Sequence, residues 1–548
     1  MTDLELARQA AAHARRVLGE AGGHLAARAS KDGKVSTAKL NALQPEAFQL
    51  ARHLAQVTAS EAMIAWGARH GEHERAVAAL YVALACAELE RWVRFNEAAL
   101  GFDDQRPRFP DELEAFIARA LSTPNLCAVG AQMLERDVDP AGAMGLSPDH
   151  LSIQQQFARF ADEQVKPRAE WIHRHDRLLP EELLQAMGEL GVFGISIPES
   201  YGGSFMDHLT MIIATEELSR ASLGAGGSVI TRPEICAKAL LAGGTEEQKQ
   251  KWLPKLASGE AVVSVAVTEP NAGSDVAAVK VSARKVEGGY LINGEKTWCT
   301  FAGRANLFVL LARTGGADEG HRGLTLFLAE KPPMKSGEGD EYAFAYTQPG
   351  GGRVSGKAIP TIGYRGMHSF AVAFEDFFVP DENRIGEEGQ GFYLQMKGFE
   401  GGRIQTAARA VGVMEAAFRD ALQYAKDRVV FGQPLGAYGL TRAKIAEMGA
   451  RLQAGRQLAY AVGKLMDEGR GSIEASLVKF LVCRDAELVT REAMQLHGGM
   501  GYSEEFAVSR YWQDARVLSI FEGAEEVLGL LVIARQYLAE RLGEAPQR

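Results

Sequence analysis

Residues 262–300 read VVSVAVTEPNAGSDVAAVKVSARKVEGGYLINGEKTWCT. Short runs rich in β-branched residues are separated here by Gly, Asn and Pro, and they depart from the helical pattern of the preceding residues. β-Branched runs that end at such turn residues are typical of strands joined by hairpins. Similar runs follow at residues 307–312, 324–329 and 371–374. We therefore predict a β-domain over residues 261–385.

Helical patterns lie on both sides of the predicted β-domain. In residues 147–260 and 386–548, apolar side chains recur at intervals of three and four, which is the period of an amphipathic helix. Residues 1–125 share this pattern, whereas residues 126–146 lack a clear period, and we interpret them as a linker. The predicted class is α+β, mostly α, with an extra N-terminal helical domain. Because no polar constellation stands out in this extension, we expect it to shape the oligomer rather than to catalyse.

The composition excludes several classes of protein. The 548 residues carry 60 Lys and Arg against 70 Asp and Glu, a net charge of −10, and 46% of them are hydrophobic. This is typical of a soluble enzyme of several domains, and the acidic balance argues against a nucleic-acid partner. The five cysteines form no Cys-x-x-Cys pair, so we expect no disulfides, no metal site and a cytoplasmic protein. An acidic N-terminus and short apolar runs predict no targeting signal and no membrane segment.

Two short motifs are similar to known functional sequences but fail in detail. Residues 351–358 read GGRVSGKA, close to a phosphate-binding loop, but Ala358 lacks the hydroxyl that binds magnesium, and Pro360 blocks the helix that must follow. Residues 497–499, His-Gly-Gly, are similar to a hydrolase oxyanion loop, yet the chain has no Gly-x-Ser-x-Gly element to supply a nucleophile. Neither a P-loop nor a hydrolase is supported.

Two polar features of the β-domain indicate a binding site. Thr268 and Ser274 lie in a turn that follows a predicted strand, where backbone amides are expected to be exposed. Trp298 and Thr300 are two residues apart on another predicted strand, and therefore on one face of it. By themselves these features could also be a polar turn and a core Trp beside a hydrogen-bonded Thr.

Further motifs follow in a fixed order. They are Gly363-Tyr-Arg-Gly366, Phe374-Glu-Asp376, Gly386-x-x-Gly389-x-Gly391-Phe392, Arg428-Val-Val-Phe431-Gly432, Gln495-Leu-His-Gly498-Gly499-Met-Gly501 and Phe521-Glu522-Gly523. Together with the two polar features, this ordered set resembles the acyl-CoA dehydrogenase family of flavoproteins over residues 147–538. The resemblance implies a helical domain, a middle β-barrel-like domain and a C-terminal four-helix bundle.

The resemblance also implies FAD as the cofactor, in a crevice between the β-domain and the bundle. The positions that match the FAD contacts of the family are Thr268, Ser274, Trp298, Thr300, Arg428, Phe431, Gln495, Gly498 and Gly499. The glycines allow close backbone approach, and an arginine offsets pyrophosphate charge. Arg428 and Phe431 match a contact to the FAD of a neighbouring subunit, which implies a homodimer or a homotetramer.

The activity implied by the resemblance is dehydrogenation of the Cα–Cβ bond of an acyl-CoA thioester. Glu522 matches the catalytic base, and the alternative base position of some relatives is occupied here by Gly402. Arg403 and Gly523 match substrate-binding positions, whereas Ala524 stands where Thr is common and would remove one hydroxyl contact to the flavin. The implied electron acceptor is an electron-transfer flavoprotein.

Arg232 is relevant to which acyl group the substrate carries. It precedes Pro233 in the helix that lines the acyl cavity of relatives, where a fatty-acyl chain needs only apolar walls. A buried guanidinium there suits a second carboxylate, although Arg232 could instead pair with Glu234 or a helix end. Together with the N-terminal extension, Arg232 implies a short branched dicarboxylyl-CoA thioester as substrate. The alternatives are a general short- or branched-chain acyl-CoA dehydrogenase and a non-catalytic flavin-binding partner protein.

Overall fold

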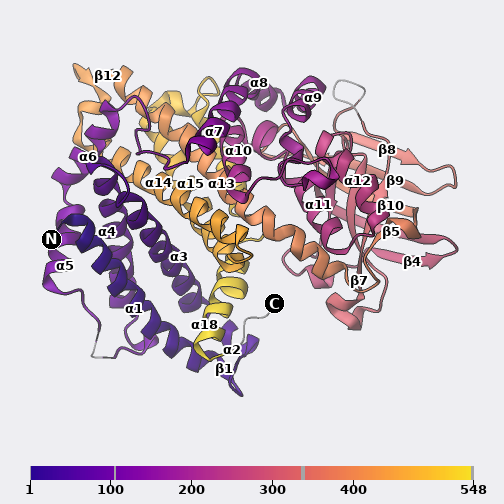
Figure 1. Ribbon diagram of the computed structural model, residues 1–548, viewed down its shortest axis with the longest axis horizontal. Coiled ribbons are helices and arrows are strands. Elements are labelled where there is room, and N and C mark those ends of the chain that lie inside the picture. The colour runs from indigo at the N-terminus through magenta and orange to yellow at the C-terminus, as the bar shows by residue number, and fades with distance from the viewer. Residues whose placement is uncertain (1, 104–105, 335–339, 545–548) are drawn as a thin grey trace. The chain divides into compact units, whose positions relative to one another are not determined.

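Figure 1 shows a computed structural model of the chain, which describes residues 2–103, 106–334 and 340–544. The chain forms two compact units, which are Met1–Leu151 with Thr406–Arg548, and Ser152–Gln405. The long helix α13 (Gly391–Asp427) contributes residues to both units. Within the described ranges, none of the helices is both long enough and apolar enough to span a membrane.

The first unit consists of helices and two short hairpins in its described residues. The N-terminal extension forms α1 (Asp3–Ala29), α2 (Thr37–Asn41), α3 (Gln44–Gly67), α4 (Glu72–Phe95), α5 (Asp111–Ala120) and α6 (Thr123–Glu135). The C-terminal part forms the end of α13, then α14 (Gly439–Asp467), α15 (Ser472–Leu496), α16 (Val508–Leu518), α17 (Glu525–Val527) and α18 (Arg535–Arg541). The hairpins are β1 (Ser30–Lys31) with β2 (Lys34–Val35), and β12 (Val429–Val430) with β13 (Gln433–Pro434).

The extension packs directly on the C-terminal helices. Helices α3, α4 and α6 contact α14, and α3 also contacts α15, as the indigo and orange ribbons of Figure 1 show. The approach of α6 is so close that a Cβ atom on Gly130 would lie 2.0 Å from the carbonyl oxygen of Arg442. Trp66 of α3 is fully buried, and its indole N–H donates to the carbonyl oxygen of Ala143 at 2.8 Å. The extension and the C-terminal helices therefore share one core.

The first half of the predicted linker is helical. Helix α6 continues to Glu135, and only the residues between it and α7 (Pro148–Phe160) lack regular structure. The helix buries just Val129, Gly130 and Met133, so its apolar pattern is too sparse to be recognised in the sequence. The prediction of an irregular segment from residue 126 was wrong for this reason.

A partly buried ion network joins the extension to the C-terminal helices. Arg451 of α14 pairs with Asp485 of α15 at 2.8 Å and with Glu88 of α4 at 3.2 Å, and Arg52 of α3 pairs with Glu88 at 2.6 Å. Buried charges are costly unless they are paired and hydrogen-bonded in good geometry. The network therefore favours one relative placement of these four helices.

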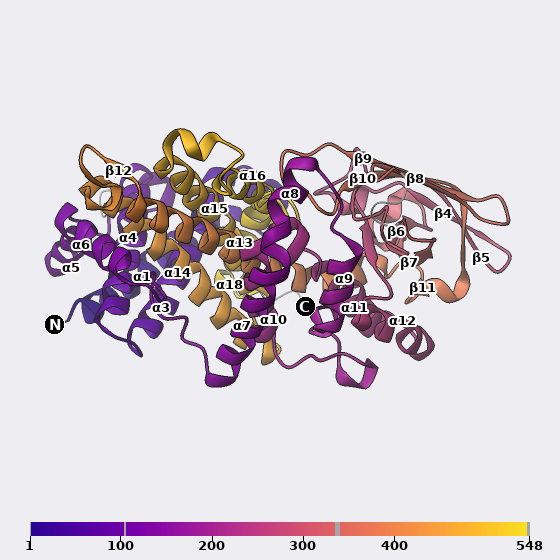
Figure 2. The same cartoon turned by 90° about the horizontal axis from the view of Figure 1, so that it is seen from above.

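The second unit combines helices with one mixed sheet. Besides most of α7, its helices are α8 (Lys166–His175), α9 (Glu181–Glu189), α10 (His208–Ala221), α11 (Thr231–Gly243) and α12 (Glu246–Ser258). Its strands are β3 (Val263–Ala266), β4 (Ser282–Val286), β5 (Gly289–Thr300), β6 (Leu307–Arg313), β7 (Leu324–Glu330), β8 (Ala343–Thr347), β9 (Arg353–Ile359), β10 (Ser369–Pro380) and β11 (Arg384–Ile385). The strand order is β11-β7-β6-β4-β5-β10-β9-β8, and β3 pairs in parallel with β6. In Figure 2 the strands lie together at one end of this unit.

Strand β6 is buried on both faces, which explains its almost wholly apolar sequence. Leu307, Val309 and Leu311 belong to a core cluster with residues of α11 and α12. Phe308 and Leu310, which point the other way, belong to a second cluster with aromatic residues of β10. The predicted class, mostly α with a β-domain in the middle and an extra N-terminal helical region, is confirmed.

Candidate active site

Near its end, strand β5 carries an indole that is open to solvent. Trp298 is 54% exposed and has a φ angle of 57°, whereas the next residue, Cys299, is fully buried. Thr300 is half-buried, and its hydroxyl hydrogen-bonds that of Ser369 on β10 at 3.0 Å. The alternative that Trp298 is a core residue is therefore wrong. An exposed aromatic face beside a hydroxyl suits a planar ligand with polar edges.

Thr268 and Ser274 lie in the turn that follows β3. The carbonyl oxygen of Thr268 accepts a hydrogen bond from the backbone N–H of Thr297 at 2.8 Å. This bond connects the turn to β5 at the residue before Trp298. Ser274 is exposed at the far end of the turn. Within the second unit, the structure thus brings Thr268 next to the strand that carries Trp298 and Thr300.

A buried ion pair that was not predicted from the sequence fixes this turn. The carboxylate of Glu269 accepts a hydrogen bond from the amine of Lys296 at 2.8 Å. It also accepts hydrogen bonds from the backbone N–H groups of Lys280 and Val281 at 2.7 and 2.8 Å. Lys296 is fully buried, and burial lowers the pKa of its amine. A single sequence gives no indication that a Glu in a Thr-Glu-Pro turn pairs with a distant Lys on a strand.

Glu522 lies between α16 and α17 in the first unit. Its backbone has a φ angle of 53°, a conformation that is uncommon for residues other than glycine. One carboxylate oxygen accepts a hydrogen bond from Nη2 of Arg409 at 2.8 Å, and the other accepts a hydrogen bond from the hydroxyl of Thr406 at 2.6 Å. The side chain of Glu522 is 11% exposed, so the carboxylate stands at the edge of a buried charge pair.

Two buried cations lie around the Phe-Glu-Gly motif. The guanidinium of Arg409 is 4.8 Å from the ring centroid of Phe521, and the amine of Lys479 on α15 donates to the carbonyl oxygen of Gly523 at 2.5 Å. Both side chains are fully buried, and burial lowers the pKa of the Lys479 amine. Neither residue was predicted, although a charged residue inside an otherwise apolar helical stretch is a signal that could have indicated them.

The other positions assigned to FAD in the first unit lie on exposed turns. Phe431 is 99% exposed at the tip of the β12–β13 hairpin, and Arg428, just before that hairpin, is also exposed. Gln495 is exposed at the end of α15, and Gly498 and Gly499 form the turn that follows it. A Cβ atom on either glycine would meet no atom within 4 Å in the described part of the chain. Their small size therefore leaves room for a ligand or a second chain.

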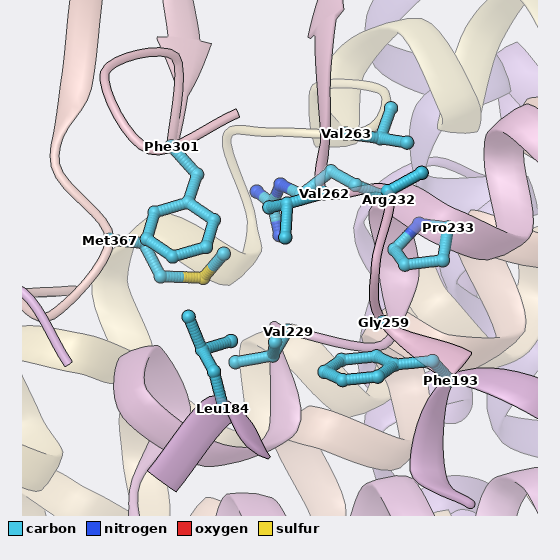
Figure 3. A pocket seen from close by; sticks show the side chains of 11 residues that line it. Leu184, Phe193, Val229, Arg232, Pro233, Gly259, Val262, Val263, Phe301 and Met367 are labelled. Atoms are coloured by element: carbon cyan, nitrogen blue, oxygen red, sulfur yellow. The ribbon is translucent and has the colours of Figure 1, made fainter. Parts of the chain in front are cut away.

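Arg232 lies at the start of α11 and points into a small cavity of the second unit, as Figure 3 shows. Its guanidinium donates to the carbonyl oxygen of Ser228 at 2.6 Å and to the hydroxyl of Tyr364 at 2.8 Å. Glu234 pairs instead with Lys238, at 2.5 Å, so the alternative that Arg232 pairs with Glu234 is wrong. Ser228 is the C-cap of the short helix Leu223–Gly227, so the other alternative, that Arg232 pairs with a helix end, is what the structure shows. In the described part of the chain, no carboxylate lies within ion-pair distance of this buried guanidinium.

The cavity itself is narrow and apolar. Its volume is about 10 Å³, which is room for about one water molecule. Leu184, Phe193, Val229, Phe301 and Met367 form much of its wall, and Figure 3 shows their side chains around the guanidinium. Arg403, the other arginine assigned to the substrate, is half-buried on α13 in the same unit.

The comparisons with known proteins agree along the chain. Residues 147–260, 264–377 and 389–538 match the models of the N-terminal, middle and C-terminal domains of acyl-CoA dehydrogenase. The (2S)-methylsuccinyl-CoA dehydrogenase of Cereibacter sphaeroides is 38% identical over 528 residues, which cover 93% of this chain and 94% of that protein. The chain belongs to the acyl-CoA dehydrogenase family.

Solved structures agree with this membership. Butyryl-CoA dehydrogenase from Megasphaera elsdenii aligns with a TM-score of 0.64 and 32% identity, over 71% of this chain and 98% of that one. A chain in the structure of the electron transferring flavoprotein of Acidaminococcus fermentans aligns with the same TM-score and identity, over 71% of this chain and 97% of that one. The resemblance inferred from the motifs is confirmed. As an acyl-CoA dehydrogenase, the protein is an oxidoreductase that acts on CH–CH groups.

Proposed function

We propose that this acyl-CoA dehydrogenase uses FAD to oxidise (2S)-methylsuccinyl-CoA to mesaconyl-CoA. The observation that carries the proposal is the extent of the similarity to the Cereibacter sphaeroides enzyme. That similarity covers 93% of the chain and so takes in residues of the N-terminal extension, whereas the similarity to butyryl-CoA dehydrogenase covers 71%. A buried arginine without a carboxylate partner in the described residues supports a substrate that brings its own carboxylate.

The residues present fit a flavin. An exposed indole at Trp298, a hydroxyl at Thr300 and a tethered turn at Thr268 offer one aromatic face and several polar contacts in the second unit. In the first unit, Arg428 and Phe431 are exposed on a hairpin and would hold the FAD of a neighbouring subunit. When bound, FAD supplies the two-electron acceptor for the hydride that leaves the β-carbon.

Glu522 is the residue that we assign as the base. In the proposed reaction the α-hydrogen leaves as a proton to a carboxylate oxygen of Glu522, and the β-hydrogen leaves with its electron pair. The α-hydrogen of a thioester is only weakly acidic, so the carboxylate has to be ionised and fixed in place. The backbone N–H of Glu522 would donate to the thioester oxygen and stabilise the charge that develops there.

Arg232 is our candidate for the distal carboxylate of the substrate. Its two acceptors, a carbonyl oxygen and a hydroxyl, are neutral, so a carboxylate would bind the guanidinium more strongly than either. The cavity beside Arg232 has room for about one water, so the contact would be mediated by water unless the pocket opens.

An anaerobic titration with a panel of acyl-CoA thioesters tests this function. Bleaching of the flavin absorbance by (2S)-methylsuccinyl-CoA, and much weaker bleaching by isovaleryl- and butyryl-CoA, is the expected result. Equal bleaching by the monocarboxylic thioesters would identify a general short- or branched-chain acyl-CoA dehydrogenase. Bound FAD that no thioester bleaches would identify a flavin-binding protein without turnover.

We also infer that an electron-transfer flavoprotein reoxidises the enzyme. The similarity to a chain in a structure of such a flavoprotein supports this partner. The reduced enzyme should then pass electrons to an electron-transfer flavoprotein much faster than to oxygen. Rapid reoxidation by oxygen alone would contradict the assignment.

A further inference from the structure

The carboxylate of Glu522 is held from one face of α13. Thr406 and Arg409 are three residues apart, so their side chains lie one above the other on the helix. Nη2 of Arg409 is 2.8 Å from Oε1 of Glu522, and the hydroxyl of Thr406 is 2.6 Å from Oε2. Each carboxylate oxygen thus accepts one hydrogen bond from this pair of residues.

A third contact, between Arg409 and Thr406, determines in which direction the Thr406 hydroxyl donates. Nη2 of Arg409 also donates to Oγ1 of Thr406, at 2.5 Å. A hydroxyl that accepts a hydrogen bond from arginine turns its own proton elsewhere, and here the acceptor is Oε2 of Glu522. Each oxygen of a carboxylate has two lone pairs, so one donor on each leaves a second position where a proton can be received.

The charges around Glu522 come from several elements. Arg409 of α13 is fully buried and pairs with it directly. In the described part of the chain, the other titratable groups nearby include Lys479, Cys483 and Glu487 of α15 and Glu525 of α17, and Glu525 pairs with Arg484 at 3.0 Å. Burial raises the pKa of the Cys483 thiol to about 12, so this group is neutral at physiological pH. The direct ion-pair partner of Glu522 is therefore a guanidinium, which stays charged at every working pH.

We propose that Arg409 and Thr406 are positioning residues that hold the carboxylate of Glu522 in the orientation needed for proton abstraction. The inference rests on the proposed function, because it assumes that Glu522 is the base. The strained backbone of Glu522, with its φ angle of 53°, is the kind of conformation that persists only where the surroundings fix it. The hydrogen bonds from α13 supply such a constraint.

The test is anaerobic flavin reduction in the FAD-loaded enzyme, with the limiting rate and the dissociation constant of the acyl-CoA measured separately. At saturating acyl-CoA, Arg409→Met should slow the limiting rate ~10- to 100-fold, because a charge-assisted hydrogen bond to the base is lost. The dissociation constant of the acyl-CoA should change less than about threefold, since bound ligand contacts are unaltered.

Companion variants separate positioning from simple support of the fold. Arg409→Lys should recover part of the limiting rate, because it restores the charge but not the geometry of the guanidinium. Thr406→Val should also slow flavin reduction ~10- to 100-fold, because its hydroxyl donates to the same charged carboxylate, and Thr406→Ser should match the wild type. Arg456→Met is the matched structural control: Arg456 is also a buried arginine of the first unit, and it pairs with Glu415 at 2.8 Å. It should lower stability and leave the limiting rate of flavin reduction unchanged.

The inference is overturned if Arg409→Met, with full FAD content, keeps the wild-type limiting rate of flavin reduction. If Arg409→Met does not fold, Arg409→Lys and Thr406→Val decide in the same way, and wild-type behaviour of both overturns it. The proposed function fails separately: a Glu522→Gln variant that reduces its flavin at the wild-type rate would remove Glu522 as the base, whatever Arg409 does.

Discussion

Trp298, Phe431 and Glu522 have φ angles of 57°, 48° and 53°. Such left-handed conformations cost about 1–3 kcal/mol for residues other than glycine, and they persist where neighbouring groups or a function require them. All three positions match motif residues that the family resemblance assigns to the flavin or to the base. They are three of eleven non-glycine residues with a positive φ angle in the described part of the chain, so strain agrees with the assigned chemistry at these positions but does not single them out.

At the same scale, Arg232→Met tests recognition of the distal carboxylate. Turnover of (2S)-methylsuccinyl-CoA should lose ~2–5 kcal/mol of transition-state stabilisation, the range for leaving one member of a buried charged pair unpaired. Isovaleryl-CoA should lose little, because it has no carboxylate to pair. Equal losses of kcat/KM on both substrates would show that Arg232 only supports the fold through Ser228 and Tyr364.

At the scale of elements, the second half of α13 is fixed to α14 by a buried ion pair. Burial by itself would raise the pKa of Glu415, but Arg456 of α14 and Arg419 together lower it to about 2 from its ordinary 4.5. A lowered carboxyl pKa stabilises the folded state at pH values above 4.5, and this contribution is lost as the pH falls from 4.5 through about 2. At neutral pH the shift corresponds to about 3 kcal/mol.

Glu415→Gln should therefore be several kcal/mol less stable than the wild type at pH 7, because Arg456 is left buried without its ion pair, a loss of roughly 3–5 kcal/mol. The difference between the two proteins should shrink between pH 4.5 and pH 2. Urea unfolding at a series of pH values measures it. A difference that stays constant over this range would contradict the assigned pKa.

Elements with strong apolar patterns were predictable from the sequence, and exposed ones were not. The runs at 307–312 and 324–329 correspond to β6 and β7, which are buried on both faces. Strand β8 has no fully buried side chain and was missed, as was β9, which occupies the segment that is similar to a P-loop. The motifs located Trp298 and Glu522. Arg409 and Lys479 could not be assigned, because their role depends on contacts between distant helices.

At the scale of the whole molecule, the N-terminal extension is part of the same compact unit as the C-terminal helices. Its helices α3, α4 and α6 cover surfaces of α14 and α15 that would otherwise be exposed. We predict that the full chain is a dimer, because the extension occupies surfaces of α14 and α15 that another subunit could otherwise contact. Light scattering that shows a tetramer would reject this prediction.

The close contact at Gly130 gives a sharper test of the same packing. Gly130→Ala would place a methyl group 2.0 Å from a carbonyl oxygen of α14, so it should lower the free energy of unfolding by about 1–3 kcal/mol. Gly23→Ala is the matched control, because Gly23 lies in helix α1 with no described atom within 4 Å of the added methyl group. It should stabilise the protein by up to about 1 kcal/mol. Equal effects in thermal unfolding would contradict the shared core.

The central claim is that Glu522 removes the α-proton of a dicarboxylyl thioester. Stopped-flow flavin reduction of the Glu522→Gln variant by (2S)-methylsuccinyl-CoA, under anaerobic conditions and with FAD content verified, tests it most directly. Loss of a general base should slow flavin reduction by ~10²- to 10⁴-fold while FAD stays bound. Retention of more than about one hundredth of the wild-type rate would contradict the account.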